Sequence, residues 1–222
     1  MTFDLRREAL LWTILLAPIL YLMLVWGDLP ERVPIHWNAA GEIDGWSSKK
    51  ALPWMVGGLQ VFLYLLMRLL PYIDPRASNL EASRSAYQKL RVVLGLLFGF
   101  IGFLMVHSAL HQQLDLPGWL LPGLFFFFAA IGNYLVRLRS NYFVGIRTPW
   151  TLEYPENWER THRFGGRLWF WGGLIGGILG FLLPAAYLKW MIILLLVLVF
   201  APILYSFVLF KKGVGSKAAT GQ

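Results

Sequence analysis

The sequence predicts an all-α integral membrane protein, built as a bundle of six transmembrane helices. Of its 222 residues, 57% are hydrophobic and only 14% are charged, a composition well outside that of soluble domains. A helix needs roughly 20 apolar residues to cross the hydrocarbon core of a membrane. Runs of about this length occupy residues 9–27, 52–70, 92–110, 118–136, 168–184 and 187–210.

The distribution of positive charge predicts the orientation of these helices. Six crossings place both termini on one side of the membrane. Sixteen of the 20 Lys and Arg residues lie on that side, in the N-terminal segment, the second and fourth connections and the C-terminal tail. Positively charged loops resist translocation, so we expect both termini to be cytoplasmic.

The same asymmetry explains the net charge of +8. We therefore expect membrane lipids as the neighbours of this chain and no direct binding to nucleic acid. The sequence contains no cysteine, which excludes disulfides, iron–sulfur clusters and thiolate zinc sites.

Residues 1–75 are predicted to form an N-terminal helical hairpin, with the outer loop 28–51 between its two spans. This loop contains "LPERVPIHWNAAGEIDGWSSKK", in which a short, partly β-branched segment precedes the turn sequences "NAAGE" and "DGW". We expect a compact, ordered loop. Its tryptophans either anchor the loop at the membrane interface or belong to a lid that contacts a ligand from outside. The ligand-facing candidates in the loop are His36, Trp37, Asn38 and Trp46.

Two further histidines lie near the outer end of the third span. His107 and His111 are four residues apart and share a helix face, and His36 is predicted on the same side of the membrane. Such a group can bind zinc with an added carboxylate, titrate between pH 5 and 8, or simply form hydrogen bonds within the bundle. We add both residues to the outer ligand-facing candidates and assign no metal or cofactor.

Residues 76–212 are predicted to form a four-span region, followed by a flexible tail at 213–222. Its most polar part is the fourth connection, 137–167, which begins with "SNYFVGIRTPWTL" after a short "RLR". Asn and Gly tolerate unusual backbone angles, which suits a turn at Asn141 and Gly145. Thr148 then offers a helix cap, with Pro149 and Trp150 after it in the first helical turn.

The rest of this connection, "PENWERTHRFGGR", predicts a short amphipathic helix at the membrane surface. At ~100° per residue, one arc carries Trp158, Thr161, His162 and Gly165. The opposite arc carries Glu156, Glu159, Arg160, Arg163 and Arg167. The uncharged face either docks the helix onto the bundle or belongs to a site for a partner, and both interpretations remain open.

Two stretches of the chain closely resemble a known family. "GNYLVRLRSNYFVGIRTPWTL" followed by "WERTHRFGGRL" resembles the signature of the SdpI family of bacterial membrane proteins. "LPERVPIHWNAAGEIDGW" resembles the small N-terminal domain, DUF1648, that many members carry. The signature residues that the resemblance marks as candidates for partner binding are Asn133, Asn141, Arg147, Thr148, Pro149, Trp150, Trp158, Thr161 and His162.

The resemblance implies an immunity protein in the bacterial plasma membrane. Such a protein protects its cell from a secreted toxic or antimicrobial peptide, and it transmits a signal by holding a cytoplasmic transcriptional repressor at the membrane once the toxin is bound. The expected partners are therefore a secreted peptide and a repressor.

Two other classes of function remain as alternatives. A membrane enzyme would need a nucleophile with a base, a carboxylate pair or metal ligands, and only His162 or the outer histidines offer a starting point. A transporter usually carries ionisable residues near the bilayer midplane, and the predicted spans contain no acidic residue. We expect a binding protein and no enzymatic activity.

Overall fold

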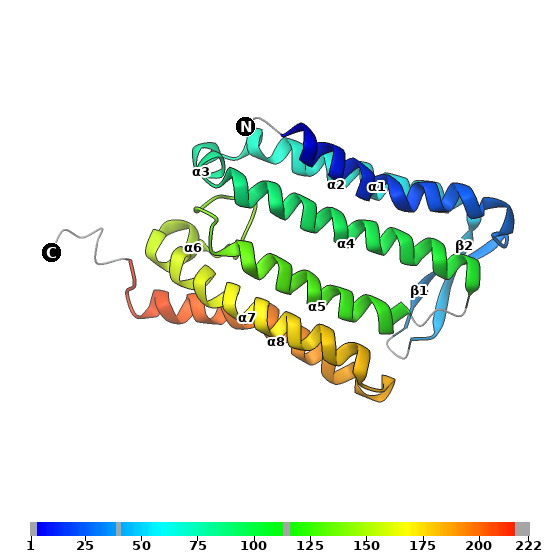
Figure 1. The fold of residues 1–222 in the computed structure, drawn as a ribbon. Coiled ribbons are helices and arrows are strands. Elements are labelled where there is room, and N and C mark those ends of the chain that lie inside the picture. The colour runs from blue at the N-terminus through cyan, green and yellow to red at the C-terminus, as the bar shows by residue number, and fades with distance from the viewer. Residues whose placement is uncertain (1–3, 39–40, 113–115, 216–222) are drawn as a thin grey trace.

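The computed structural model describes residues 4–38, 41–112 and 116–215. Six long helices run nearly parallel through the molecule (Figure 1). They are α1 (Leu5–Val25), α2 (Leu52–Ile73), α4 (Arg84–His111), α5 (Leu116–Leu135), α7 (Pro155–Leu182) and α8 (Leu188–Lys211). The shorter elements are α3 (Ala77–Ala82), α6 (Pro149–Glu153), the strands β1 (Arg32–Trp37) and β2 (Ile43–Ser48), and single 3-10 turns at Trp26–Asp28, Lys49–Ala51 and Ala185–Tyr187. All six predicted apolar runs are therefore helical.

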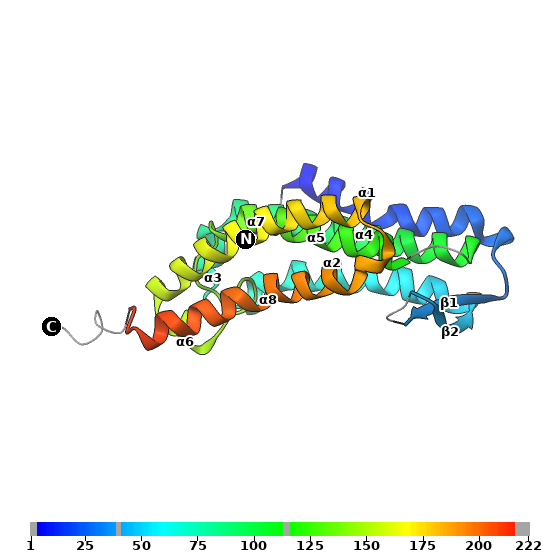
Figure 2. The ribbon, with the colours of Figure 1, turned by 90° about the horizontal axis from the view of Figure 1, so that it is seen from below.

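The helices α1, α4, α5 and α7 form a row in which each packs against the next, and α2 and α8 lie on one side of that row (Figure 2). Glycines allow the close approach of α5 and α7. A Cβ atom at Gly132 would lie 2.6 Å from the carbonyl oxygen of Gly166, and one at Gly173 would lie 2.4 Å from that of Phe125. The backbones of these two helices thus touch along much of their length.

The two ends of the bundle carry different structures. The strands β1 and β2 lie at one end, which we name the hairpin end. The opposite end carries α3, α6 and the loop between α5 and α6, and we name it the signature end. Residues 4 and 215, the outermost residues described, both lie at the signature end (Figure 1). Residues 216–222 of the predicted flexible tail lie outside the described residues.

Among the described residues, five helical segments are long and apolar enough to cross a membrane: Leu5–Asp28, Lys49–Ile73, Arg84–His111, Gly118–Leu135 and Leu188–Lys211. The chain is therefore a mostly helical, multi-pass membrane protein. Helix α7 does not reach the same hydropathy, because its first half is the polar segment that follows Pro155. The prediction of a separate short amphipathic helix was wrong at this point, since the helix continues unbroken into the apolar run that follows.

The outer loop is a β-hairpin, so the chain is not wholly helical. β1 and β2 pair antiparallel, with Val33 opposite Ser47 and Trp37 opposite Ile43, and irregularities interrupt the register around His36. Val33 is completely buried in a cluster with apolar residues of α1, α2 and α4. This contact fixes the hairpin against the helices and agrees with the prediction of a compact, ordered loop.

Candidate functional site

Asn141 holds the loop after α5 in one conformation. Its side chain is completely buried, and its amide donates hydrogen bonds of 2.9 Å to the carbonyl oxygens of Arg139 and Val144. Its oxygen accepts the backbone N–H groups of Phe143 at 3.1 Å and Val144 at 2.7 Å. Asn141 thus uses both its donors and both its acceptor positions inside the loop.

Gly145 is required by both backbone angle and space. Its φ of +125° belongs to a region that residues with a side chain rarely adopt. A Cβ atom there would lie 2.5 Å from Nε2 of His162 and 3.0 Å from the ring of Trp158. This close approach lets the next backbone N–H, that of Ile146, donate to His162 Nε2 at 3.1 Å.

His162 has a structural role in this geometry. Its Nδ1 lies 2.8 Å from the carbonyl oxygen of Trp158, which only accepts, so Nδ1 carries the proton and Nε2 accepts the N–H of Ile146. The ring also stacks on Trp158, with 3.9 Å between the ring centroids. Burial lowers the pKa of His162 from 6.5 to about 4, against an opposing effect of the hydrogen bond to Trp158. The neutral imidazole therefore has both nitrogens occupied. His162 precedes the apolar run 168–184 and lies outside the five segments named above as apolar enough to cross a membrane.

Helix α6 begins at a capping box. The Thr148 hydroxyl accepts the backbone N–H of Thr151, and the Thr151 hydroxyl accepts that of Thr148 at 2.8 Å. The Thr151 hydroxyl also donates to the carbonyl oxygen of Ile146 at 3.0 Å. The predicted cap at Thr148, with Pro149 in the first helical turn, is confirmed.

Hydrogen bonds join this region to α8 and to the end of α5. The indole N–H of Trp150 donates to the Ser206 hydroxyl at 2.7 Å, and the Asn157 amide donates to the Ser206 carbonyl oxygen at 3.0 Å. The Thr161 hydroxyl donates to Asn157 at 3.1 Å. On the other side, the indole N–H of Trp158 donates to the carbonyl oxygen of Leu138 at 2.8 Å.

A second set of contacts ties the loop to the region between α2 and α4. Asp74, which is buried, accepts the backbone N–H of Tyr142 at 3.0 Å. The Ser83 hydroxyl accepts the N–H of Arg139 at 2.9 Å, and the Asn79 amide donates to the Ser140 carbonyl oxygen at 2.8 Å. Sequence reasoning missed Asp74, Asn79, Ser83 and Ser206, because polar residues in a turn or singly in a span carry no local signal of a distant partner.

The structure divides the predicted signature residues into two groups. The buried or half-buried members form the network just described, and they are Asn141, Thr148, Trp150, Trp158, Thr161 and His162. Arg147, Pro149 and Asn133 are exposed. Arg147 donates to the carbonyl oxygen of Tyr142 at 2.7 Å, whereas Asn133 lies on α5 outside the network. The predicted division of 155–167 into an uncharged and a charged face is confirmed, since the uncharged face is buried and the charged face exposed.

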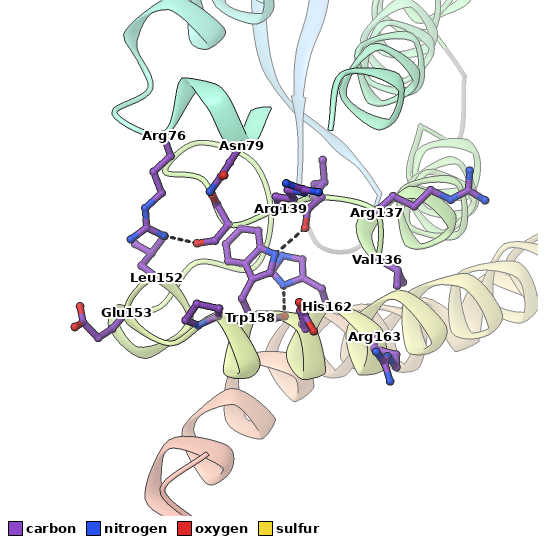
Figure 3. Close-up of a pocket in the computed structure, with 14 residues that line it drawn as sticks. Arg76, Asn79, Val136, Arg137, Arg139, Leu152, Glu153, Trp158, His162 and Arg163 are labelled. Atoms are coloured by element: carbon purple, nitrogen blue, oxygen red, sulfur yellow. Dashed lines mark hydrogen bonds between the residues drawn. The ribbon is translucent and has the colours of Figure 1, made fainter. Parts of the chain in front are cut away.

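A cavity of about 690 Å³ opens beside this network (Figure 3). Trp158 and His162 form part of its wall, with Arg76 and Asn79 of the α2–α4 region on the opposite side. Its other charged lining residues are Arg137, Arg139, Glu153, Glu159 and Arg163.

The hairpin end carries an open apolar groove of about 390 Å³ between β1 and the ends of α4, α5 and α8. The strand side includes three of the predicted outer residues, His36, Trp37 and Asn38. The helix side is apolar and consists of Met105, Leu120, Leu121, Leu124, Leu188 and Ile192. Among the described residues, the buried indole N–H of Trp37 has no acceptor.

The other outer candidates, Trp46, His107 and His111, do not line the groove. Trp46 is 41% exposed on β2, with the Arg32 guanidinium 6.0 Å from its ring centre. The rings of His107 and His111 lie 4.3 Å apart, and Nδ1 of His107 is 3.1 Å from the Tyr21 hydroxyl. His36 instead lies 2.5 Å from Asp44. Within the described ranges, no three His, Cys, Asp or Glu side chains gather as a metal site.

The bundle also contains a buried ion pair that the sequence did not reveal. Glu8 lies in the first turn of α1 and forms two hydrogen bonds with Arg91 of α4, whose side chain is 3% exposed. The Tyr64 hydroxyl donates to Glu8 at 3.1 Å. Glu8 precedes the predicted apolar run 9–27, because α1 begins before that run, at Leu5.

Fold and site together define a multi-pass helical membrane protein with a hydrogen-bonded polar connection at one end and a β-hairpin at the other. Comparison with known proteins narrows this class. The SdpI/YfhL protein family model matches residues 137–208, and that of a domain of unknown function, DUF1648, matches residues 13–61. The first covers the signature connection, α7 and most of α8, and the second covers most of α1, the hairpin and the start of α2.

The chain is also similar to the immunity protein SdpI of Bacillus subtilis (strain 168). The two are 26% identical over 189 residues, which cover 85% of this chain and 88% of SdpI. The resemblance to the SdpI family, with its DUF1648 domain, is thereby confirmed. No solved structure matches the chain significantly.

Proposed function

We propose that this protein is an immunity protein of the bacterial plasma membrane, which captures a secreted membrane-active peptide at its hairpin end. The similarity to SdpI over most of both chains supports the general role. The groove between β1 and the helices is the single observation that carries the peptide site.

The proposed topology has six crossings, with α7 as the fifth in chain order. Helix α7 has 28 residues and packs along α5, one of the candidate spans. Its apolar half exposes Trp171, Ile175 and Ile178 on the outside of the bundle, as lipid contact requires. The excess of Lys and Arg on the side of the signature end supports a cytoplasmic location for that end and for both termini.

The groove suits an amphipathic or hydrophobic peptide. It combines an apolar wall with one strand of a two-stranded sheet, and strands bind extended peptides through main-chain hydrogen bonds. The Trp37 indole N–H, buried and without an acceptor among the described residues, provides a donor for a peptide carbonyl. Apolar burial provides most of the binding free energy and this donor fixes the orientation of the peptide.

The signature end is the proposed site for a cytoplasmic repressor. Arg147, Arg160 and Arg163 are exposed there, above a network that holds the backbone in place. Signalling requires that the peptide bind two arrangements of the bundle with different affinities. Immunity by peptide capture requires no such change.

The test is survival of a sensitive bacterial host that expresses the protein and is challenged with a toxic peptide of the kind SdpI-family proteins protect against. Ile35 lines the groove on β1, and Ile43 on β2 lies outside its lining. We expect Ile35→Asn, like deletion of residues 31–46, to abolish protection while Ile43→Asn retains it, with equal amounts of each point variant in the membrane. Equal protection by both point variants would refute the peptide site. No protection by the wild type would refute the immunity function.

A further inference from the structure

The cavity at the signature end has the size and charge of a ligand site. Its volume of about 690 Å³ lies within the range of small-molecule sites. It exceeds what a bare phosphate ion fills, and it has room for a headgroup with its glycerol. Figure 3 shows four arginines around the cavity, of which Arg76 is half-buried and Arg137, Arg139 and Arg163 are exposed.

Three of the four arginines that line this cavity are free to bind. Within the described part of the chain, Arg137, Arg139 and Arg163 form no ion pair. Arginines elsewhere at this end do have acidic partners, as in Arg84 with Glu81 and Arg160 with Glu156.

Arg76 is held in place by neighbouring side chains. Its guanidinium donates to the Ser140 hydroxyl and lies 5.0 Å from the ring centre of Tyr142. Arg76 is thus held in position before a ligand binds, and the guanidinium N–H groups of the other three arginines remain available as hydrogen-bond donors.

The charge balance indicates a singly or doubly charged anion. Glu153 and Glu159 also line the cavity, so four positive charges face two negative ones. A guanidinium has a planar set of donors that matches a phosphate group. The two carboxylates would repel a polyanion, whereas a single phosphate group can bind the arginines in the rest of the lining.

The helix that precedes this cavity, α5, also lines an apolar groove. A groove of about 340 Å³ lies between α4 and α5, with an almost wholly apolar lining that includes Phe127 and Ala130 of α5. Ala130, Tyr134 and Arg137 follow one another at i, i+4 and i+7 on α5 and the turn after it. Val136, beside them in the cavity wall, is 47% exposed. Polar and apolar surfaces thus meet at the cavity mouth as they do in a phospholipid.

We infer that this cavity binds the phosphate group of an anionic phospholipid through the arginines that line it, Arg76, Arg137, Arg139 and Arg163. An acyl chain then follows α5 toward the groove beside α4. The site is independent of peptide capture, since it lies at the opposite end of the bundle. A lipid here joins α3, the signature loop and α7 through shared contacts, and it couples this end to the composition of the membrane.

The test measures lipid retention by the purified full-length protein with native mass spectrometry. The protein is equilibrated with equal amounts of phosphatidylglycerol and phosphatidylcholine in detergent. We compare the wild type with Arg139→Gln/Arg163→Gln and with the control Arg160→Gln/Lys212→Gln, which removes the same charge from exposed positions outside the cavity lining. We expect the wild type and the control to retain phosphatidylglycerol over phosphatidylcholine and the cavity variant to lose about tenfold of that preference.

Two further measurements separate the loss of lipid binding from misfolding and from the binding of a soluble phosphate ester. Arg139→Lys/Arg163→Lys preserves the charge without the planar donors, so it should fold if the glutamine variant does not and should show an intermediate preference. Soluble glycerol phosphate should displace the lipid only weakly, because it lacks the acyl chains. Equal preference in the wild type and both cavity variants would overturn the inference. Binding of glycerol phosphate without any lipid preference would assign the cavity to a soluble phosphate ester. Binding of a poly-glutamate peptide in place of lipid would assign it to an acidic protein partner. Either result would overturn the lipid assignment.

Discussion

The signature end and the hairpin end use the same residue types in opposite ways. At the signature end, Asn141, Trp158 and His162 are buried, and each has its polar atoms paired inside the protein. At the hairpin end, Trp46 and His36 are largely exposed, and Trp37 has a buried donor with no acceptor among the described residues. The end with the stronger sequence motif is thus built for a fixed backbone. The hairpin end instead carries an open apolar groove with this donor on its strand side.

The largest expected difference in the free energy of unfolding is between the alanine variants of two tryptophans. Trp158→Ala should lower the free energy of unfolding by about 4 kcal/mol, because it removes a 2% exposed ring and its hydrogen bond to Leu138. Trp46→Ala, at a 41% exposed ring, should cost about 1 kcal/mol or less. Reversible unfolding in detergent measures both. Membrane insertion should survive in each variant, since the apolar spans are unchanged, whereas cytoplasmic signalling should be lost in Trp158→Ala. Similar unfolding costs for the two changes would contradict the contrast between the ends.

Two glycines give the next comparison. Gly145→Ala should destabilise the protein by about 3 kcal/mol, from its positive φ and the clash with His162. Gly27, at the hairpin end, has no atom within 4 Å of an added Cβ, so Gly27→Ala should change stability by less than about 0.5 kcal/mol. Thermal unfolding midpoints of the two variants test this directly. A tolerated Gly145→Ala would mean that the signature loop adopts another conformation in the membrane.

The alanine variants of two asparagines should differ less in stability. Asn141→Ala leaves backbone groups of a buried loop without partners and should cost about 2 kcal/mol. Asn38 bonds to exposed Glu42, so Asn38→Ala should cost about 0.5 kcal/mol. Hydrogen exchange should show faster exchange over residues 139–146 in the first variant only. Unchanged protection there would refute the role of Asn141.

The last comparison concerns a pH dependence at the signature end. Folding lowers the pKa of His162 from 6.5 to about 4, so between these values the unfolded chain binds a proton that the folded protein excludes. Stability should be full above pH 6.5, fall by up to about 1.4 kcal/mol per pH unit as the pH drops toward 4, and change no further from this group below that. Unfolding of the wild type and of His162→Gln at about pH 7 and about pH 5 isolates this contribution. An identical loss of stability in both proteins would show that His162 is not the titrating group.

Much of the helical architecture and part of the site could be predicted from local patterns. Apolar runs predicted all six long helices, and helical spacing predicted which face of residues 155–167 is buried. The Thr148 cap followed from neighbouring residue types. Tertiary partners could not be predicted in this way. Asp74 meets Tyr142 from 68 residues away, and Trp150 meets Ser206 from 56 residues away.

The sequence by itself therefore determined the membrane class, the positions of the apolar helices and the polarity of the signature segment, because hydropathy and periodicity are properties of contiguous residues. Only the tertiary structure decided that the amphipathic segment is the first part of α7, and that Glu8 pairs with Arg91. It also decided that His162 has both ring nitrogens occupied by backbone partners. The physical reason is the cost of burying an unpaired polar group, which each such residue avoids through a partner supplied by the fold.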